Sequence, residues 1–316
     1  MHCPTLDELP PPPLGKIGWP WTEESPQLPD TMPDGRPCWP PVSIVTPSYN
    51  QGQFIEETIR SVLLQGYPNL EYLVIDGGST DGSRSIIQAY APYLTHWCSE
   101  KDNGQSAAIS EGFRMSTGEI LGWVNSDDLL LPGCLRKVGK YFVEHPDVDC
   151  VVGGTIVVDE ITRPVRNRLG LPRIVRGERE TFRKLLLRRG LSFYQPASFW
   201  RRGAYTAAGG LDIDFHFALD YDLYLRLAEL KPFGHFDELL ACFRIHPQSK
   251  TTLLQSVRQS ECANIWQWYE SEHSIIANTV YREYLALTNI MRNLPIRVGV
   301  LLGLVRLPNI GNRSHE

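Results

Sequence analysis

The fold is decided by the stretch VSIVTPSYNQGQFIEETIRSVLLQGYPNLEYLVIDGGSTDGS, residues 42–83. Two apolar, β-branched runs in it predict strands, and the polar segment after each run precedes an amphipathic, helix-forming segment. We predict strands at 42–46 and 70–75 and helices at about 53–65 and 83–90, with Asn50 and Asp81 as candidate helix caps. Strand, helix, strand and helix at this spacing predict a right-handed βαβ unit with parallel strands.

The same alternation continues downstream, so the fold class predicted is α/β with a mainly parallel central sheet. Further strands are predicted at 96–99, 120–124 and 150–158, and further helices near 104–115 and 133–144. The second half is less regular and mostly helical, with helices predicted at about 176–189, 220–230 and 253–291. In a sheet of this kind, ligands bind at the carboxyl ends of the strands.

Composition divides the chain into three regions. Residues 1–41 hold twelve of the 24 prolines, too many for a helix or a central strand, so we predict an irregular extension that either wraps the domain or stays mobile. Residues 42–250 form the predicted α/β domain, and residues 251–316 a helical C-terminal extension.

Charge and cysteine content narrow the classes of partner. The net charge of −5 argues against nucleic acid. Residues 163–189, however, contain ten Arg or Lys and two Glu, a local charge of +8 that suits a phosphorylated or membrane-bound acceptor, although a solvated basic helix accounts for it equally well. Seven cysteines without a C-x-x-C pair are typical of reduced thiols.

We expect a cytoplasmic location. The N-terminus has no basic stretch followed by an apolar run, and the apolar run at 298–305 is shorter than a membrane span. That run could still lie on the inner face of a membrane as a peripheral contact.

Acidic residues follow two of the predicted strands. Asp76 stands before a Gly-Gly pair that lets a ligand approach the backbone, and its carboxylate could accept a hydrogen bond from a uracil or a ribose. Asp127 and Asp128 would repel each other unless a cation or a cap satisfies them. The alternatives are an ordinary glycine-rich turn at Asp76 and a helix cap at Asp128.

Two later motifs carry candidate catalytic groups. Asp220 and Asp222 begin a predicted helix, and either could serve as a general base or simply favour the helix start. His246 becomes a candidate ligand for a metal or a diphosphate only if it faces the Asp127 site.

In this order the motifs resemble the inverting family 2 glycosyltransferases of the GT-A fold, over about residues 42–249. The resemblance rests on the segments TPSYN (46–50), DGGSTDGS (76–83), EKDNGQS (100–106), NSDD (125–128), QPASFWR (195–201), DYDLYLRL (220–227) and RIHPQS (244–249). It implies a GT-A nucleotide-binding sandwich. It also implies a metal-assisted transfer, with Mg²⁺ or Mn²⁺ as cofactor, from a nucleoside-diphosphate sugar to a glycan or lipid-linked acceptor.

The resemblance also implies a role for each matched residue. The nucleotide-sugar site would comprise Pro47, Tyr49, Asp76, Gly104, Asn125, Ser126 and Asp127. Asp127 and His246 would hold the metal, and Asp220 would be the catalytic base. The acceptor region would include Gln195, Pro196 and Trp200.

Two departures from the family pattern refine the expected function. Asn125 stands where the first acid of the D-x-D motif is expected, and the Q-x-x-R-W motif of processive synthases is absent. We therefore expect transfer of a single sugar, most simply from a UDP-sugar, in cell-surface polysaccharide or glycolipid synthesis. The alternatives are a nucleotidyltransferase and an inactive sugar-nucleotide-binding protein of the same fold.

Overall fold

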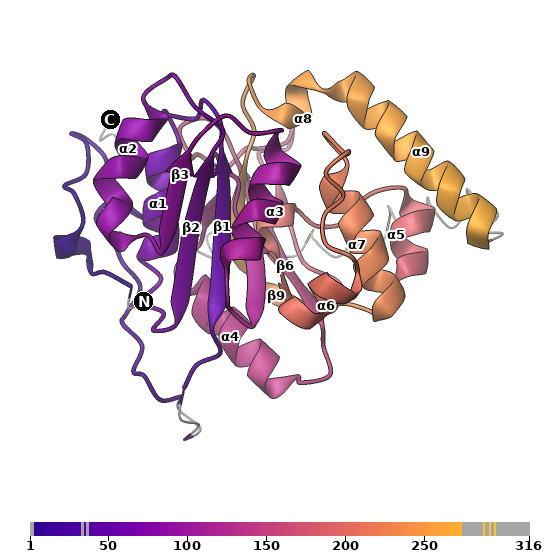
Figure 1. The fold of residues 1–316 in the computed structure, drawn as a ribbon, viewed down its shortest axis with the longest axis horizontal. Helices are drawn as coiled ribbons and strands as arrows, with labels where there is room; N and C mark the ends of the chain where they lie inside the picture. The colour runs from indigo at the N-terminus through magenta and orange to yellow at the C-terminus, as the bar shows by residue number, and fades with distance from the viewer. Residues whose placement is uncertain are drawn as a thin grey trace.

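The computed structural model describes residues 3–32, 35, 38–273, 287, 291 and 294. A single mixed sheet with the strand order β3-β2-β1-β4-β8-β6-β9-β5 forms the centre of the fold, and β7 pairs with β6 (Figure 1). The strands are β1 (Val42–Ser48), β2 (Leu70–Asp76), β3 (His96–Ser99), β4 (Ile120–Trp123), β5 (Leu129–Leu130), β6 (Cys150–Val158), β7 (Ile174–Val175), β8 (Ser198–Arg201) and β9 (Gly234–Arg244).

The strands run mainly parallel, as the sequence predicts. β1 pairs in parallel with β2 and β4, β2 pairs in parallel with β3, and β6 pairs in parallel with β9. β8 is inserted antiparallel between β4 and β6, and the short β5 and β7 are also antiparallel to their neighbours. The carboxyl ends of β1, β2, β4, β6 and β9 therefore meet at one edge, at the top of Figure 1.

Helices cover both faces of this sheet. They are α1 (Ile55–Leu63), α2 (Ser83–Tyr90), α3 (Gln105–Met115), α4 (Cys134–Glu144), α5 (Phe182–Arg188), α6 (Arg202–Ala207), α7 (Leu219–Leu230), α8 (Lys250–Leu253) and α9 (Gln255–His273). One apolar core lies between the sheet and α1, α2 and α4, and a second lies between the sheet and α3, α5, α6, α7 and α9. Because helices cover both faces, the central strands β1, β2, β4 and β6 are buried at nearly every position.

The predicted strands and the first four helices are confirmed, and several local predictions are wrong. Asn50 does not cap α1, which begins at Ile55; it adopts a left-handed backbone (φ 53°) in the preceding turn. Asp128 does not cap α4, which begins six residues later. The helix predicted at 176–189 is confined to α5, and the one predicted at 253–291 begins with α8 and α9, its remainder lying largely outside the described residues.

Asp81 lies one residue before the N-cap of α2, which is Gly82. Its carboxylate accepts hydrogen bonds from the backbone N–H and the hydroxyl of Ser83. These bonds lower the pKa of Asp81 against the opposing effect of burial, so it satisfies the helix start from just outside the predicted cap position.

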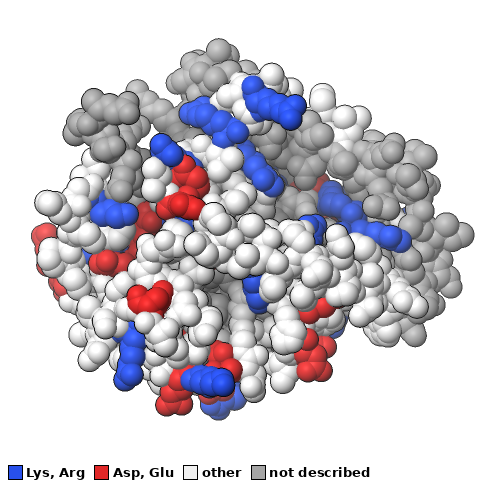
Figure 2. Space-filling view, turned by 90° about the horizontal axis from the view of Figure 1, so that it is seen from above, with Lys and Arg blue, Asp and Glu red and all other residues white. Residues whose placement is uncertain are grey.

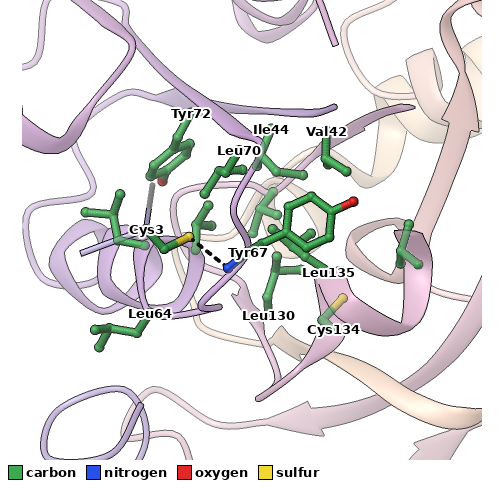
Figure 3. Close-up of a cluster of buried hydrophobic side chains, with 14 of the residues drawn as sticks. Cys3, Val42, Ile44, Leu64, Tyr67, Leu70, Tyr72, Leu130, Cys134 and Leu135 are labelled. Atoms are coloured by element: carbon green, nitrogen blue, oxygen red, sulfur yellow. Dashed lines mark hydrogen bonds between the residues drawn. The ribbon is translucent and has the colours of Figure 1, made fainter. Parts of the chain in front are cut away.

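The proline-rich extension wraps the domain. Trp19 and Trp39 are fully buried in the core that also contains α1 and α4, and the Trp19 indole donates to the Leu130 carbonyl at 2.8 Å. In Figure 3 the Cys3 side chain lies in the same cluster, and its sulfur accepts the Tyr67 N–H at 3.3 Å. The buried Arg60 guanidinium of α1 donates to the carbonyls of Pro10, Pro20 and Trp21. The extension is therefore part of the folded unit.

We predict that Trp19→Ala lowers the free energy of unfolding by about 3–5 kcal/mol, because it leaves a large cavity in a well-packed core. Urea denaturation followed by circular dichroism measures this. Leu14→Ala is the matched control in the same extension, because Leu14 is fully exposed and should change stability by less than about 0.5 kcal/mol. Similar small effects of both substitutions would show that the extension does not contribute to the core.

The C-terminal helix α9 packs on the second core. Ile265 and Tyr269 are buried there, and the Trp266 indole donates to the hydroxyl of Tyr221 in α7 at 3.1 Å. Figure 1 shows α9 at the upper right, on the same side of the sheet as α5 and α7. The described part of the predicted C-terminal extension therefore packs directly on the α/β domain.

Candidate active site

The polar motifs gather at the carboxyl edge of the sheet, which Figure 2 shows from above. Acidic and basic side chains are interspersed over the visible part of this face. The loops after β1, β2, β4 and β9 and the start of α7 bring most of the predicted site residues to it.

The loops after β1 and β2 are tied to each other by side-chain hydrogen bonds. Asn50 accepts the Thr80 N–H at 2.9 Å through its side-chain oxygen, and its own N–H donates to the Ser79 hydroxyl at 2.7 Å. Next to this link Tyr49 is 64% exposed, whereas Pro47 is buried within β1. The two loops thus form a fixed rim on which an aromatic ring is presented to solvent.

Asp76 lies beneath this rim instead of on its surface. It is fully buried, and its carboxylate accepts bonds from the N–H (2.9 Å) and hydroxyl (2.5 Å) of Ser79 and from the hydroxyl of Ser99 (2.7 Å). A carboxylate at the end of a buried strand needs such donors, since leaving it unpaired is costly. In this structure the direct effect of Asp76 is to shape the loop, and direct contact with a nucleobase stays a prediction.

The acid that faces the Gly-Gly turn from outside is Asp102, to which the sequence assigned no role. A Cβ at Gly77 would lie 3.0 Å from the Asp102 carboxylate oxygens, and this half-buried carboxylate accepts the Gly104 N–H at 2.8 Å. Gly104 itself is exposed and has a φ of 102°, a conformation that favours glycine. Asp102 is an acid of the EKDNGQS segment, so its place in that motif could have marked it as a candidate from the sequence.

His246 faces Asp127, as its candidate role as a ligand requires. The Nε2 atom of His246 lies 2.9 Å from Oδ2 of Asp127, although the two residues are 119 positions apart. The imidazole is buried against the Phe54 ring, whose centroid is 4.6 Å away, and the Asp127 side chain is 17% exposed. The imidazole itself has no exposed surface, so solvent or a ligand reaches this pair through the Asp127 carboxylate.

Asp128 points away from its neighbour and into the protein. Its carboxylate accepts the Arg244 N–H at 2.9 Å, and burial together with the adjacent Asp127 charge raises its pKa well above the usual value. The buried Arg244 guanidinium pairs with Glu57 at 2.8 Å and donates to the Asp127 carbonyl at 2.7 Å. Arg244 thus fixes the backbone of the Asp127 loop, a role that depends on contacts with residues remote in sequence.

A chain of amide contacts links Asn125 to a lysine beyond the RIHPQS segment. The side-chain oxygen of Asn125 accepts a bond from Gln105 at 2.7 Å, and Gln105 in turn accepts one from the Lys250 ammonium at 2.7 Å. Burial lowers the pKa of Lys250, and the nearby Asp220 and Glu261 carboxylates oppose that shift. Ser126 is buried beside this chain.

The two acids at the start of α7 have different surroundings. Asp222 is buried and ion-paired with Arg226, which also donates to the carbonyls of Ala208 and Gly210. Asp220 is half-buried and accepts the N–H of Tyr221 at 2.7 Å; burial raises its pKa to about 6. Asp222 is therefore occupied by a structural ion pair.

A residue of α9 completes the start of α7. The Glu261 carboxylate accepts the backbone N–H groups of residues 216, 217 and 218, each at 2.8 Å. These donors lie just before the first turn of the helix that carries Asp220. Glu261 was not a candidate from the sequence, because its contact with α7 is made only in the tertiary fold.

The predicted acceptor residues lie mostly inside the protein. Trp200 is fully buried between Trp123 and Phe113, because β8 lies within the sheet and directs its side chains into the cores. Pro196 is also buried, and Gln195 donates to the Trp123 carbonyl at 2.8 Å. Trp200 therefore belongs to the core and presents no surface to an acceptor, while Gln195 supports the strand that leads to Asn125.

The part of the chain that the structure describes contains neither a larger metal-binding cluster nor a membrane-spanning helix. No group of three or more His, Cys, Asp or Glu side chains in this part of the chain could hold a metal ion. Within the same residues, none of the helices has both the length and the apolar character needed to cross a membrane.

An α/β sheet with polar loops at its carboxyl edge is the architecture of a nucleotide-binding enzyme, and comparison with known proteins gives the family. The family model described as Glycosyl transferase family 2 matches residues 43–206, about half of the 316-residue chain. The chain belongs to this family.

The relatives found by sequence comparison include a polysaccharide synthase and an uncharacterized glycosyltransferase. The chain is 28% identical over 204 residues to the chondroitin synthase of Escherichia coli, covering 63% of this chain and 28% of that protein. It is 30% identical over 190 residues to an uncharacterized glycosyltransferase of Mycobacterium tuberculosis, covering 60% of this chain and 69% of that one. The chain thus spans less than a third of the chondroitin synthase.

Solved structures share the fold. The S. aureus TarS 1-349 structure in complex with UDP-GlcNAc has a TM-score of 0.54 and 16% identity, covering 84% of this chain and 76% of that chain. The mannosyltransferase PcManGT from Pyrobaculum calidifontis, in complex with GDP-Man and Mn2+, has a TM-score of 0.53 and 19% identity, covering 91% of this chain and 81% of that chain.

Proposed function

We propose that this protein transfers one sugar from a nucleoside-diphosphate sugar to a hydroxyl acceptor, with inversion at the anomeric carbon. The observation that carries the proposal is the meeting of Asp127 and His246 at the same edge of the sheet as Asp220, in a chain of glycosyl transferase family 2. The acceptor is a glycan or a lipid-linked glycan, in keeping with the polysaccharide synthase among its relatives.

The donor binds across the carboxyl edge, with the nucleoside on the rim formed by the loops after β1 and β2. Tyr49 offers the base an exposed aromatic face on a turn that hydrogen bonds hold in place. Asp102 and the Gly77–Gly78 backbone provide a carboxylate and a close approach for the ribose hydroxyls. Of the structural neighbours, one binds UDP-GlcNAc and one GDP-Man, and we propose UDP as the carrier here.

The diphosphate lies near Asp127 and His246, which fit one divalent cation. A carboxylate oxygen and an imidazole nitrogen are two suitable donors, so Asp127 and His246 would hold the cation together with ligands from outside the protein. When bound, Mg²⁺ or Mn²⁺ would neutralise charge that develops on the departing diphosphate. Arg244 keeps Asp127 at this edge through its bond to the Asp127 carbonyl.

Asp220 acts as the general base. The acceptor oxygen attacks the anomeric carbon, the bond from that carbon to the diphosphate oxygen breaks, and the hydroxyl proton passes to the Asp220 carboxylate. Direct displacement from the opposite face inverts the configuration. Asp220 suits this role better than Asp222, whose carboxylate is held in the ion pair with Arg226.

The pH dependence of the reaction follows from the surroundings of Asp220. Because burial raises its pKa to about 6, the carboxylate gains a proton as the pH falls through that value and can no longer accept one. We predict that kcat/KM is level above this pKa and falls about tenfold per pH unit below it. A pH–rate profile measures this. In the Asp220→Asn variant the residual kcat/KM should no longer fall at acid pH. If the same fall at acid pH remained in this variant, it would belong to another titrating group.

Incubation with radiolabelled sugar nucleotides and a panel of glycan and polyprenyl-linked acceptors tests the function itself. A glycosyltransferase releases nucleoside diphosphate and labels the acceptor. A nucleotidyltransferase would instead release pyrophosphate from a nucleoside triphosphate, and an inactive binding protein would bind the donor without turnover. Either of those results would contradict the proposal.

A further inference from the structure

An arginine-bearing hairpin, residues 159–175, projects from the end of β6, and we call it the arginine arm. Its two limbs pair through the antiparallel bridge between Arg166 and Pro172 and through the bond from the Asn167 N–H to the Leu171 carbonyl at 2.9 Å. The turn is closed by the side chain of Asn167, which accepts the Leu169 N–H at 2.9 Å, and by Gly170 with a φ of 72°. The arm is therefore an ordered element with a defined tip.

The two faces of the arginine arm differ in character. Leu171 and Ile174 are buried toward β6 and anchor the inner face. On the outer face and tip, Leu169 is 76% exposed and stands beside the exposed Arg166 and Arg168. The arginine arm holds four arginines and two acids, and both acids lie at its base, where Asp159 pairs with Arg163 at 3.1 Å. The tip therefore combines positive charge with an exposed leucine.

The rest of the basic stretch is partly neutralised. In and before α5, Arg188 pairs with Glu178 at 2.7 Å and with the buried Glu180 at 2.9 Å, and Lys184 lies 3.6 Å from Glu178. Residues 163–175 and 176–189 each carry a net charge of +4, and the second segment has exposed arginines of its own, Arg179 and Arg183. What distinguishes the arginine arm is the exposed Leu169 beside its exposed arginines.

The base of the arginine arm is attached to the candidate active site. The Arg244 guanidinium donates to the carbonyls of Asp159 at 3.2 Å and Glu160 at 3.1 Å, where the arm begins, and to the Asp127 carbonyl at 2.7 Å. One buried side chain therefore fixes both the arm and the loop that carries Asp127. A surface bound by the arginine arm would therefore lie beside the carboxyl edge of the sheet, where Asp127 lies.

We propose that the tip of the arginine arm docks on an anionic lipid surface. Guanidinium groups pair with lipid phosphates, and a leucine at the tip can enter the boundary between headgroups and acyl chains. Cations and an apolar side chain on one rigid turn suit a membrane better than a soluble polyanion, which would gain nothing from the leucine. Docking would bring hydroxyl acceptors anchored in that surface to the active-site edge. The inference does not depend on which sugar or nucleotide is used.

Co-sedimentation of the full chain with vesicles tests the proposal. We expect binding to vesicles of equal parts phosphatidylglycerol and phosphatidylcholine, and little binding to pure phosphatidylcholine. Arg166→Gln with Arg168→Gln should weaken binding roughly 20-fold, the effect expected of two cations near an anionic surface, and Leu169→Gln roughly fivefold. The charge-preserving pair Arg166→Lys with Arg168→Lys should retain most of the binding.

The matched control removes the same charge from the same basic stretch but outside the arginine arm. Arg179 and Arg183 are exposed, and replacing both with Gln should leave vesicle binding within about twofold of the parent protein. Equal losses in the control and the arm variants, equal binding to neutral vesicles, or no binding by the parent protein would each overturn the proposal. The assay measures binding without turnover, so its failure is distinct from failure of the proposed function.

Discussion

Replacing Asp127 with Ala is expected to lower the rate of sugar transfer roughly 10³-fold or more and to remove the metal-dependent part of UDP affinity. The Asp127 carboxylate is the partly exposed acid of the NSDD segment, and it faces His246 at 2.9 Å. A cation held there would contribute several kcal/mol by stabilising charge on the leaving diphosphate, which sets the size of the effect. Calorimetric titration of the protein with UDP, in Mn²⁺ and in a chelator, measures the metal-dependent part of the UDP affinity. Steady-state kinetics measures the rate of sugar transfer.

Asp128→Asn is the matched control for this experiment. Asp128 is the adjacent acid, but it is buried and accepts bonds from the Arg244 N–H and the Asn125 side chain. This variant should preserve the difference in UDP affinity between Mn²⁺ and chelator even if its melting temperature falls. Equal UDP affinity of the parent protein with Mn²⁺ and with chelator would exclude the metal role of Asp127.

The alternating part of the fold could be predicted from the sequence because its signals are local. The strands β1, β2 and β4 are apolar runs or buried alternations, and each strand from β1 to β4 is followed by a polar turn and then a helix, so residues 42–144 supply the pattern in order. Since the strands are parallel, their carboxyl ends must meet at one edge. The sequence therefore predicts that Asp127, which follows β4, lies at the same edge as the loops after β1 and β2, and the parallel pairing of these strands puts it there.

Features that depend on long-range packing could not be predicted in this way. The antiparallel insertion of β8 between β4 and β6 buries Trp200, and no local pattern in the QPASFWR segment distinguishes a core strand from an exposed loop. The contact of Glu261 with the start of α7 and that of Arg244 with Glu57 join residues at least 43 positions apart. The burial of Asp76 could not be predicted either, because the donors that satisfy its carboxylate come partly from the neighbouring strand β3.

Replacing Asp220 with Asn is expected to lower kcat roughly 10²- to 10⁴-fold, the usual contribution of a general base, and to leave UDP affinity nearly unchanged. The substitution keeps the shape and the acceptor oxygen that binds the Tyr221 N–H at 2.7 Å, but it removes the basic carboxylate. Because burial raises the pKa of Asp220, the folded protein disfavours its charged form, and a neutral amide should not lower the melting temperature near neutral pH. Thermal unfolding and UDP titration together separate loss of catalysis from loss of structure.

Asp222→Asn distinguishes the two acids of α7. This change breaks the ion pair with Arg226, which also holds the carbonyls of Ala208 and Gly210, so we expect a lower melting temperature and a modest fall in kcat. The pH–rate profile of this variant should keep its acid limb, because Asp220 remains. Normal turnover by Asp220→Asn together with a folded but inactive Asp222→Asn would instead assign the base to Asp222. Full activity in both variants would place the base outside this helix.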